Sequence, residues 1–140
     1  MSHLISTSAL LNVISPEKKN NGSSFTINSN ATGVEYTYKI ARKEFKGKWY
    51  THVSVETQYL KFMYLGSYFK GKIYKKGAVI TSPSASAIAH VLNGVEKGFS
   101  SKLDLQLSLM HTGNCLRCGR ELTDSDSIGR GLGPTCASLV

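Results

Sequence analysis

The sequence is short of cysteine and of acidic residues. Its 140 residues include three cysteines and nine Asp or Glu, against 17 Lys or Arg. An odd and small number of cysteines argues against the disulfide framework of a secreted protein. A chain of this length can fold around its own hydrophobic core without disulfides. We therefore expect a reducing, cytoplasmic compartment.

The sequence also lacks a long apolar run. Residues 4–14 are apolar overall but are interrupted by Ser6, Thr7, Ser8 and Asn12. A membrane-spanning helix needs about 20 consecutive apolar residues. We therefore expect neither a signal peptide nor a membrane span, and no membrane partner.

Enzyme signatures are missing as well. The sequence contains no His-x-Glu deaminase motif, no paired carboxylates of the kind used by two-metal nucleases and no recognisable Ser/His/Asp set. A metal held by three cysteines and a water would be hydrolytic only with a nearby general base such as Glu121. We therefore expect a binding protein and not an enzyme.

Positive charge and aromatic side chains are concentrated in the same block. Residues 39–76 hold ten of the basic residues and only two acids, Glu44 and Glu56, so this block accounts for the net charge of +8. Eleven of the thirteen aromatic residues lie between Tyr36 and Tyr74. Lysines interleaved with rings are typical of nucleic-acid-binding surfaces, where charges follow phosphates and rings stack on bases. The alternative is a solvated basic surface over an aromatic core.

Alternating apolar and polar residues predict an antiparallel meander. The expected strands cover residues 25–27, 34–40, 49–55, 59–65, 68–74 and 103–109, with a turn at Gly66-Ser67. Ser82-Pro83 and an apolar face at helical spacing predict one amphipathic helix over residues 83–97. The expected fold class is α+β: an antiparallel sheet, one packed helix and a small C-terminal zinc knuckle. The expected divisions are an N-terminal arm and linker (1–24), a basic β-rich domain (25–110) and a zinc-binding module (111–140).

Strand facing sorts the aromatic residues. Tyr36, Tyr38 and Trp49 share faces with aliphatic residues and are predicted to be core. Tyr50 lies on the opposite face from Trp49, and Tyr68 and Tyr74 are expected to share a face with lysines, so these rings are predicted to be exposed. The predicted nucleic-acid-binding residues are Arg42, Lys43, Phe45, Lys46, Lys48, Tyr50, Tyr68, Lys70, Lys72, Tyr74, Lys75 and Lys76.

All three cysteines lie near the C-terminus, in the pattern His111-x3-Cys115-x2-Cys118-x17-Cys136. A Cys-x-x-Cys turn brings two thiolates together, and structural zinc takes four Cys or His ligands. The predicted ligands of a structural zinc ion are therefore His111, Cys115, Cys118 and Cys136. A redox pair and ordinary buried thiols remain alternatives, and the alternative role of His111 is that of a hydrogen-bonded residue at a strand end.

The segment "CLRCGRELTDSDSIGRGLGPTC" resembles a module of uncharacterised function found in small phage-encoded proteins, with the pattern CxxCGRxLT…SIxxGxGPxC. The matching residues run from Cys115 to Cys136, and Ser125 replaces a proline common in the module. The resemblance implies zinc binding, with a β-rich segment and a helix before the module. In general character, the chain is also similar to the single-stranded-DNA-binding cofactors of phage RNA polymerases.

Together these features predict a sequence-tolerant protein that binds single-stranded nucleic acid, with DNA favoured, and that contains a structural zinc. The resemblance adds the expectation of a phage-encoded transcription or replication cofactor, working in the cytoplasm of an infected bacterium with an RNA polymerase or another replication or transcription protein. The alternative is a zinc-stabilised protein-interaction module that recruits or inhibits an enzyme of the host or the phage. In that case Arg117, Arg120 and Arg130 would face the partner.

Overall fold

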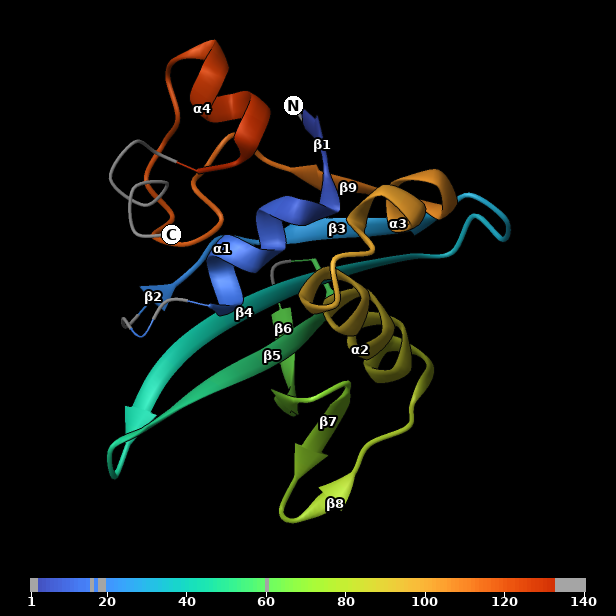
Figure 1. The fold of residues 1–140 in the computed structure, drawn as a ribbon, viewed down its shortest axis with the longest axis vertical. Helices are drawn as coiled ribbons and strands as arrows, with labels where there is room; N and C mark the ends of the chain where they lie inside the picture. The colour runs from blue at the N-terminus through green and yellow to red at the C-terminus, as the bar shows by residue number, and fades with distance from the viewer. Residues whose placement is uncertain (1–2, 16, 18–19, 60, 133–140) are drawn as a thin grey trace.

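A computed structural model describes residues 3–15, 17, 20–59 and 61–132, and all statements below concern this part of the chain. Its nine strands form one antiparallel sheet in the order β1-β9-β3-β4-β5-β6-β7-β8, with β2 paired to β4 (Figure 1). The expected α+β class is confirmed. In chain order the elements are β1 (His3–Ile5), η1 (Thr7–Leu10), α1 (Leu11–Ile14), β2 (Asn20–Asn21), β3 (Phe25–Ser29), β4 (Glu35–Phe45), β5 (Lys48–Gln58), β6 (Lys61–Phe69), β7 (Lys72–Lys75), β8 (Ala78–Val79), α2 (Pro83–Glu96), α3 (Ser100–Gln106), β9 (Leu107–His111) and α4 (Ser125–Arg130).

The long β4–β5 hairpin divides its side chains cleanly between two faces. Opposed residues in an antiparallel pair point to the same side, and Tyr38 pairs with Val55 while Ile40 pairs with Val53. All four are buried beneath the helices. We call this side of the sheet the inner face and the opposite side the outer face. The predicted alternation along both strands is therefore confirmed.

Helices α1 and α2 pack across the inner face (Figure 1). Helix α2 begins at Pro83, as predicted, and ends at Glu96, one residue before the predicted end; it buries Ala85, Ile88 and Leu92 at helical spacing. The hydroxyl of Tyr38 donates a hydrogen bond to the carbonyl oxygen of Ser84 at 2.7 Å, which ties β4 to the start of this helix. The predicted core role of Tyr38 is confirmed.

Residues 3–14 pack into the same core as the sheet. β1 pairs with β9, and Leu10 and Val13 in η1 and α1 are almost completely buried. The carboxylate of Asp104 accepts a hydrogen bond from the Thr7 amide at 2.8 Å and another from the Ser6 hydroxyl at 2.6 Å. Residues 3–14, which were expected to belong to an N-terminal arm, are thus joined to the sheet and the core.

The predicted strand over residues 103–109 is wrong in its first half. Residues 100–106 form helix α3, and only residues 107–111 are extended. The alternating leucines do not share an environment, because Leu103 is buried whereas Leu105 is 82% exposed. Leu103 packs directly over Gly94 of α2, where an added Cβ would come within 2.8 Å of its side chain. This close approach between two helices cannot be read from a period-two pattern.

The predicted turn at Gly66-Ser67 is also wrong. Both residues lie within β6, where the register shifts from Val53↔Gly66 to Ser54↔Tyr64 and leaves Leu65 as an extra residue in a β-bulge. Gly66 has φ 149°, and a Cβ there would lie 2.5 Å from the carbonyl oxygen of Tyr74. The predicted single strand over residues 68–74 is wrong as well, because Lys70 and Gly71 form the turn between β6 and β7, and Tyr68 and Tyr74 consequently point to opposite faces.

Leu116, Leu122 and Leu132 of the C-terminal region are buried in the main hydrophobic core. Helix α4 was not expected from the sequence. Asp124 caps its first turn by accepting a hydrogen bond from the amide of Ser127, and Gly131 ends it in the left-handed conformation. No helix of the described residues is long and apolar enough to cross a membrane.

Replacing Gly66 with Ala should lower the free energy of unfolding by about 2–4 kcal/mol, because the new Cβ collides with backbone of β7 and the φ angle disfavours alanine. Urea unfolding measures the change. Gly129→Ala is the matched control, since a Cβ at this helical glycine meets no atom within 4 Å and alanine favours helix by about 1 kcal/mol. A Gly66→Ala variant as stable as the wild type would contradict the tight bulge.

Candidate nucleic-acid interface and cysteine knuckle

The outer face of β4–β7 gathers lysines and rings that are distant in the sequence. Lys43 pairs with Tyr50 across β4 and β5, and Lys39 pairs with Ser54. His52 pairs with Ser67 of β6, which in turn pairs with Tyr74 of β7. The lysines are exposed and the other side chains are partly buried. The period-two alternation of β4 and β5 is sufficient to place the residues of these two strands on one surface.

A hollow of about 600 Å³ lies on this outer face. Its lining includes Lys39, Lys43, His52, Ser54 and Tyr64. Two cations and two ring side chains therefore border one concavity. We refer to it as the outer hollow.

His52 is the centre of a hydrogen-bonded cluster in the outer hollow. Its Nδ1 lies 2.9 Å from the hydroxyl oxygen of Tyr64 and 3.2 Å from that of Ser67, and these two hydroxyls are 3.2 Å apart. The ring of His52 also stacks against Tyr50, with centroids 6.2 Å apart and an interplanar angle of 23°. The cluster holds three ring side chains of adjacent strands in defined orientations. Burial lowers the pKa of His52, and the nearby charge of Lys43 lowers it further.

Lysine side chains lie against several rings. The Nζ of Lys39 is 4.4 Å from the centroid of Phe62, and the Nζ of Lys75 is 5.9 Å from that of Tyr64. Both distances are within the range of cation–π attraction. The interleaving of charge and aromatic groups seen in the sequence is thus also present on the folded surface.

Two of the predicted interface residues point the other way. Tyr68 is 6% exposed on the inner face, and its hydroxyl donates to Glu96 Oε1 at 2.5 Å. The prediction that its ring is exposed is therefore wrong, because Tyr68 pairs with Thr51, which is also buried on the inner face. Arg42 is 8% exposed, and its Nη1 donates to the hydroxyl of Thr51 at 2.9 Å.

Most of the other predicted residues occupy hairpin ends. Phe45, Lys46 and Lys48 lie at the β4–β5 turn, and Lys70 and Lys72 at the β6–β7 turn. Lys75 and Lys76 lie at the β7–β8 turn, the latter in the left-handed conformation. Phe45 is exposed as predicted.

Four residues of the outer face were missed as binding candidates: Lys39, His52, Phe62 and Tyr64. The alternation of β4 and β5 already separated Lys39 and His52 from the core, so this signal was available. The facing of Phe62 and Tyr64 was not predictable, because the strand pairing around the bulge determines it.

The Cys-x-x-Cys segment forms a tight knuckle. The amide of Gly119 donates to the carbonyl oxygen of Cys115 at 2.9 Å, and the amide of Cys115 donates to the carbonyl oxygen of Arg120 at 2.8 Å. Cys115 is buried and Cys118 is exposed. The two cysteines therefore flank one tight turn but differ in exposure.

His111 lies at the end of β9, and both its ring nitrogens take part in hydrogen bonds. Nδ1 accepts from the amide of Gly113 at 3.0 Å, so Nε2 donates to the carbonyl oxygen of Ile128 at 2.7 Å. This is the arrangement of a hydrogen-bonded strand-end histidine. Zinc ligation by His111 would require one of these bonds to be replaced. Burial lowers the pKa of His111, which is consistent with a neutral ring.

Cys136 lies outside the described residues. The amide of Leu116 donates to the carbonyl oxygen of Gly131 at 2.9 Å, which fixes the end of α4 beside the knuckle. Among the described residues, no group of three His, Cys, Asp or Glu side chains is placed to hold a metal. A zinc site therefore depends on Cys136.

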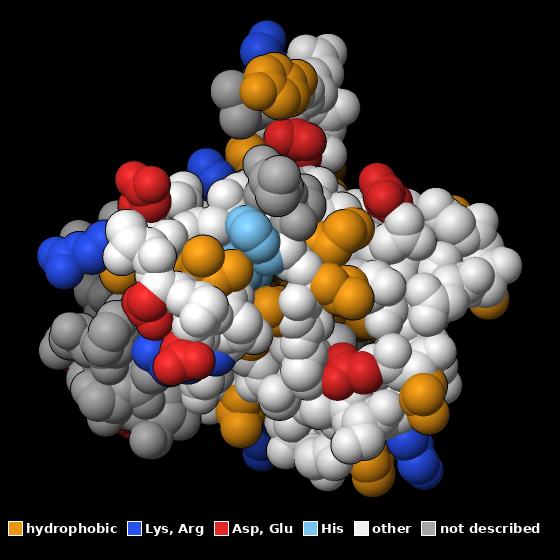
Figure 2. All heavy atoms as spheres, turned by 90° about the horizontal axis from the view of Figure 1, so that it is seen from above, with side chains coloured by type: hydrophobic (Ala, Val, Ile, Leu, Met, Phe, Trp, Pro, Cys, Tyr) orange, Lys and Arg blue, Asp and Glu red, His pale blue; other side chains and the backbone are white. Residues whose placement is uncertain are grey.

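The arginines around the knuckle differ in accessibility. Arg117 is 5% exposed. Arg130 donates from Nε to the carbonyl oxygen of Leu132 and from Nη2 to the hydroxyl of Ser127. Arg120 is exposed. Seen from the end with α4 and β1, Lys and Arg side chains appear mainly at the margins, whereas acidic and hydrophobic ones are spread over the surface (Figure 2).

The pKa of His52 should lie below 6.5, and Lys43→Ala should raise it without restoring the ordinary value, because burial is the larger cause. A depressed pKa in the folded protein means that the unfolded chain binds the proton first. The contribution of His52 to stability is therefore complete above pH 6.5 and declines as the pH falls below it. An NMR titration of the His52 ring measures the pKa, with Lys97→Ala as the control. A wild-type value of 6.5 or higher would contradict the buried cluster.

Comparisons with known proteins give one match. Residues 109–140 match a family of unknown function (DUF6011), and this segment contains β9 from Leu109 onward, the cysteine knuckle and α4. No curated protein and no solved structure matches the chain. The C-terminal part of the chain is therefore similar to that family, and the match does not include β3 to β8.

Proposed function

We propose that the outer face of β4–β7 binds single-stranded nucleic acid with little sequence preference, with DNA favoured. The observation that supports this most directly is the outer hollow, where Lys39 and Lys43 lie beside His52 and Tyr64. Lysines neutralise phosphates, and partly exposed rings stack on bases of any sequence. Lys72, Tyr74 and Lys75 extend the surface across β7.

Single strands suit this surface better than a duplex. Rings on a sheet reach the faces of bases only when the bases are unstacked from a partner strand. Readout of base edges in a duplex commonly uses the two-pronged guanidinium of arginine. Arg42 is the only arginine in the basic block, and it points to the inner face, where Thr51 holds it.

A structural zinc ion in the knuckle complements this proposal. Cys115, Cys118 and Cys136 would hold it, with His111 as the fourth ligand if its hydrogen bonds rearrange. Four protein ligands leave no open position for substrate, so the ion would stabilise the fold and would not catalyse a reaction. The protein is accordingly proposed to be a binding protein and not an enzyme.

The biological setting is proposed from the resemblance of the C-terminal module to small phage-encoded proteins. The chain would act in the cytoplasm of an infected bacterium as a transcription or replication cofactor, with an RNA polymerase or related protein as partner. The alternative is a zinc-stabilised protein-interaction module. The arginines expected to face such a partner give this alternative limited support. Arg117 is buried, and Arg130 donates hydrogen bonds to residues of its own segment.

The nucleic-acid proposal predicts different effects for charge and for stacking. Changing Lys39 and Lys43 together to Ala should make the log–log dependence of affinity on salt shallower by about 1–1.5, because two phosphate contacts are lost. Changing Tyr64 to Ala should weaken binding by about 1–3 kcal/mol with little change in that slope. Fluorescence anisotropy with a labelled oligothymidylate at several salt concentrations measures both effects.

Matched controls lie elsewhere on the surface. Lys97 and Lys102, changed together to Ala, remove the same charge away from the outer face, and Tyr59→Ala removes a ring that is 85% exposed. A generic basic surface would respond equally to both lysine pairs and to neither tyrosine. That result, or equal affinity for duplex DNA, would reject the proposal in favour of the interaction module.

The zinc proposal predicts about one zinc ion per chain in protein purified without chelator. Cys118→Ser should lower both zinc content and stability, because structural zinc binding contributes directly to folding. Metal analysis and thermal unfolding measure these changes. Ser84→Ala serves as the control for a small side-chain change away from the cysteines. Wild-type protein that is folded and free of zinc would show that the cysteines are ordinary thiols or a redox pair.

A further inference from the structure

The sequence Phe-Lys-Gly-Lys occurs twice, at residues 45–48 and 69–72. In each copy the Phe and the last Lys pair with each other, and the Lys-Gly between them forms the two-residue turn of a β-hairpin. The hairpin is β4–β5 for the first copy and β6–β7 for the second. Successive antiparallel strands reverse direction, so the two turns lie at the same end of the sheet. In both copies the Nζ of the first lysine lies 5.3 Å from the centroid of the preceding phenylalanine ring.

The first lysine of each turn adopts an unusual backbone conformation. Lys46 has φ 51° and Lys70 has φ 44°, and the glycine that follows each is also left-handed. Turns of this kind favour Asn or Gly at the first position, and a residue with a long side chain is less favourable there. Lys76 occupies the same position in the β7–β8 turn, with φ 51°. The turn geometry alone therefore does not explain lysine at position 70.

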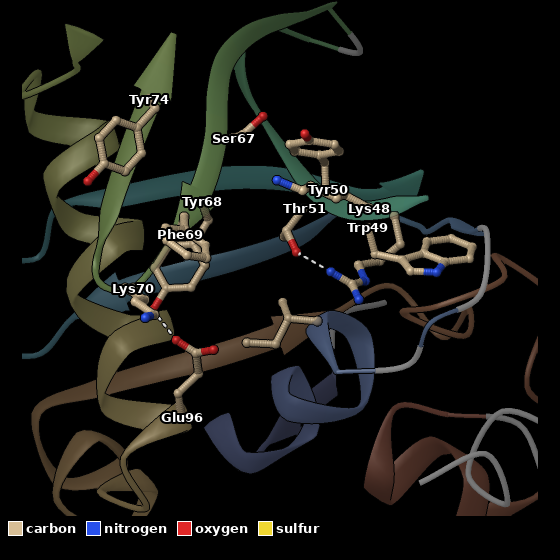
Figure 3. Close-up of a pocket in the computed structure, with 12 residues that line it drawn as sticks. Lys48, Trp49, Tyr50, Thr51, Ser67, Tyr68, Phe69, Lys70, Tyr74 and Glu96 are labelled. Carbon is tan, nitrogen blue, oxygen red and sulfur yellow. Dashed lines mark hydrogen bonds between the residues drawn. The ribbon is translucent and has the colours of Figure 1, made fainter. Parts of the chain in front are cut away.

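A cleft of about 650 Å³ opens where the two hairpins separate. The pairing of β5 with β6 ends at Thr51↔Tyr68, and beyond this pair the strands lead into their separate turns. Lys48 and Trp49 line one side and Phe69 and Lys70 the other (Figure 3). The hydrogen bonds from Arg42 to Thr51 and from Tyr68 to Glu96 fix side chains in the wall.

The lining combines ring faces with an excess of positive charge. The lining includes three cations, Arg42, Lys48 and Lys70, but a single carboxylate, Glu96, to which the Tyr68 hydroxyl donates a hydrogen bond. The volume lies within the usual range for small-molecule sites. An aromatic ring system with an attached phosphate complements such a lining, because the rings can stack on the base and the lysines can neutralise the phosphate. The carboxylate offers a hydrogen-bond acceptor to the base or sugar.

We propose that the cleft between the two Phe-Lys-Gly-Lys hairpins binds a nucleotide. The base lies against Trp49 and Phe69, and the phosphate lies between Lys48 and Lys70. The site goes beyond the proposed binding of strands by the outer face, because it needs neither the outer hollow nor a polynucleotide. The nucleotide is either a free one or one unit of a bound strand.

Trp49 provides a direct readout, because it is the only tryptophan in the chain. Titration with thymidine 5′-monophosphate (dTMP) should quench its fluorescence and move the indole N–H signal in NMR spectra. Thymidine lacks the phosphate and inorganic phosphate lacks the base, so each should bind at least about five-fold more weakly than dTMP. Failure of dTMP to change either signal up to about 10 mM would overturn the proposal.

Two matched pairs of variants test which groups carry the binding. Lys70→Asn should weaken dTMP binding about three- to ten-fold, because it removes a cation from the cleft, while the melting temperature stays level or rises by about 1–3 °C. Lys76→Asn makes the same change in the same kind of turn outside the cleft, so its affinity should be unchanged. Phe69→Ala should weaken binding at least about five-fold, whereas Phe45→Ala, in the other copy of the motif, should not.

Comparing the affinities of the protein for dTMP and for pentathymidylate shows whether the cleft takes a free nucleotide or one unit of a strand. Tighter binding of the pentamer, lost in the Lys39→Ala/Lys43→Ala variant while dTMP binding is kept, assigns the cleft to one unit of a strand that continues over the outer face. Equal affinities assign it to a free nucleotide. If the outer face does not bind strands but dTMP still binds, the cleft site is supported and the proposed function of the outer face is rejected. Equal losses in Lys70→Asn and Lys76→Asn would overturn the cleft site.

Discussion

The packing of the β4–β5 hairpin against α2 is the constraint on which the rest of the structure depends. Tyr38, Ile40, Val53 and Val55 are almost completely buried on one face. Because alternate residues of a strand point to opposite sides, burying these four forces their lysine, tyrosine and histidine neighbours onto the other face. A slip of one residue in register would bury lysines and expose the core. The same contacts that stabilise the domain therefore also create the surface proposed to bind nucleic acid.

Two local irregularities add features that a regular sheet would lack. The bulge beside Gly66 turns Tyr64 and Ser67 toward His52, which produces the hydrogen-bonded cluster of the outer hollow. Beyond Thr51 and Tyr68 the two hairpins separate, which opens the cleft beside Trp49. Bulges are common beside functional sites because they redirect side chains without breaking the sheet. Both candidate sites of the described residues thus lie where β5 and β6 deviate from ideal pairing.

The C-terminal segment is attached to the sheet through buried contacts and backbone hydrogen bonds. Leu116 enters the main core, and its amide bonds to Gly131 at the end of α4. His111 joins the last strand to α4 through Ile128. These contacts position the knuckle beside β9 and α4. A zinc ion held by the three cysteines would add its own contribution to the folding of this segment, as closed structural zinc sites do.

The sequence by itself determined the α+β class, the alternation of β4 and β5, the limits of α2 and the spacing of the cysteines. These are local properties, since strand period, helix period and turn residues act over a few positions. Only the tertiary structure decided the facing of residues 61–69, because the bulge in β6 depends on pairing with β5. The helical state of residues 100–106 likewise depends on the packing of Leu103 over Gly94. The inward position of Arg42 and the cleft beside the two Phe-Lys-Gly-Lys hairpins were decided in the same way, because contacts between segments far apart in the chain leave no periodic signal in either one.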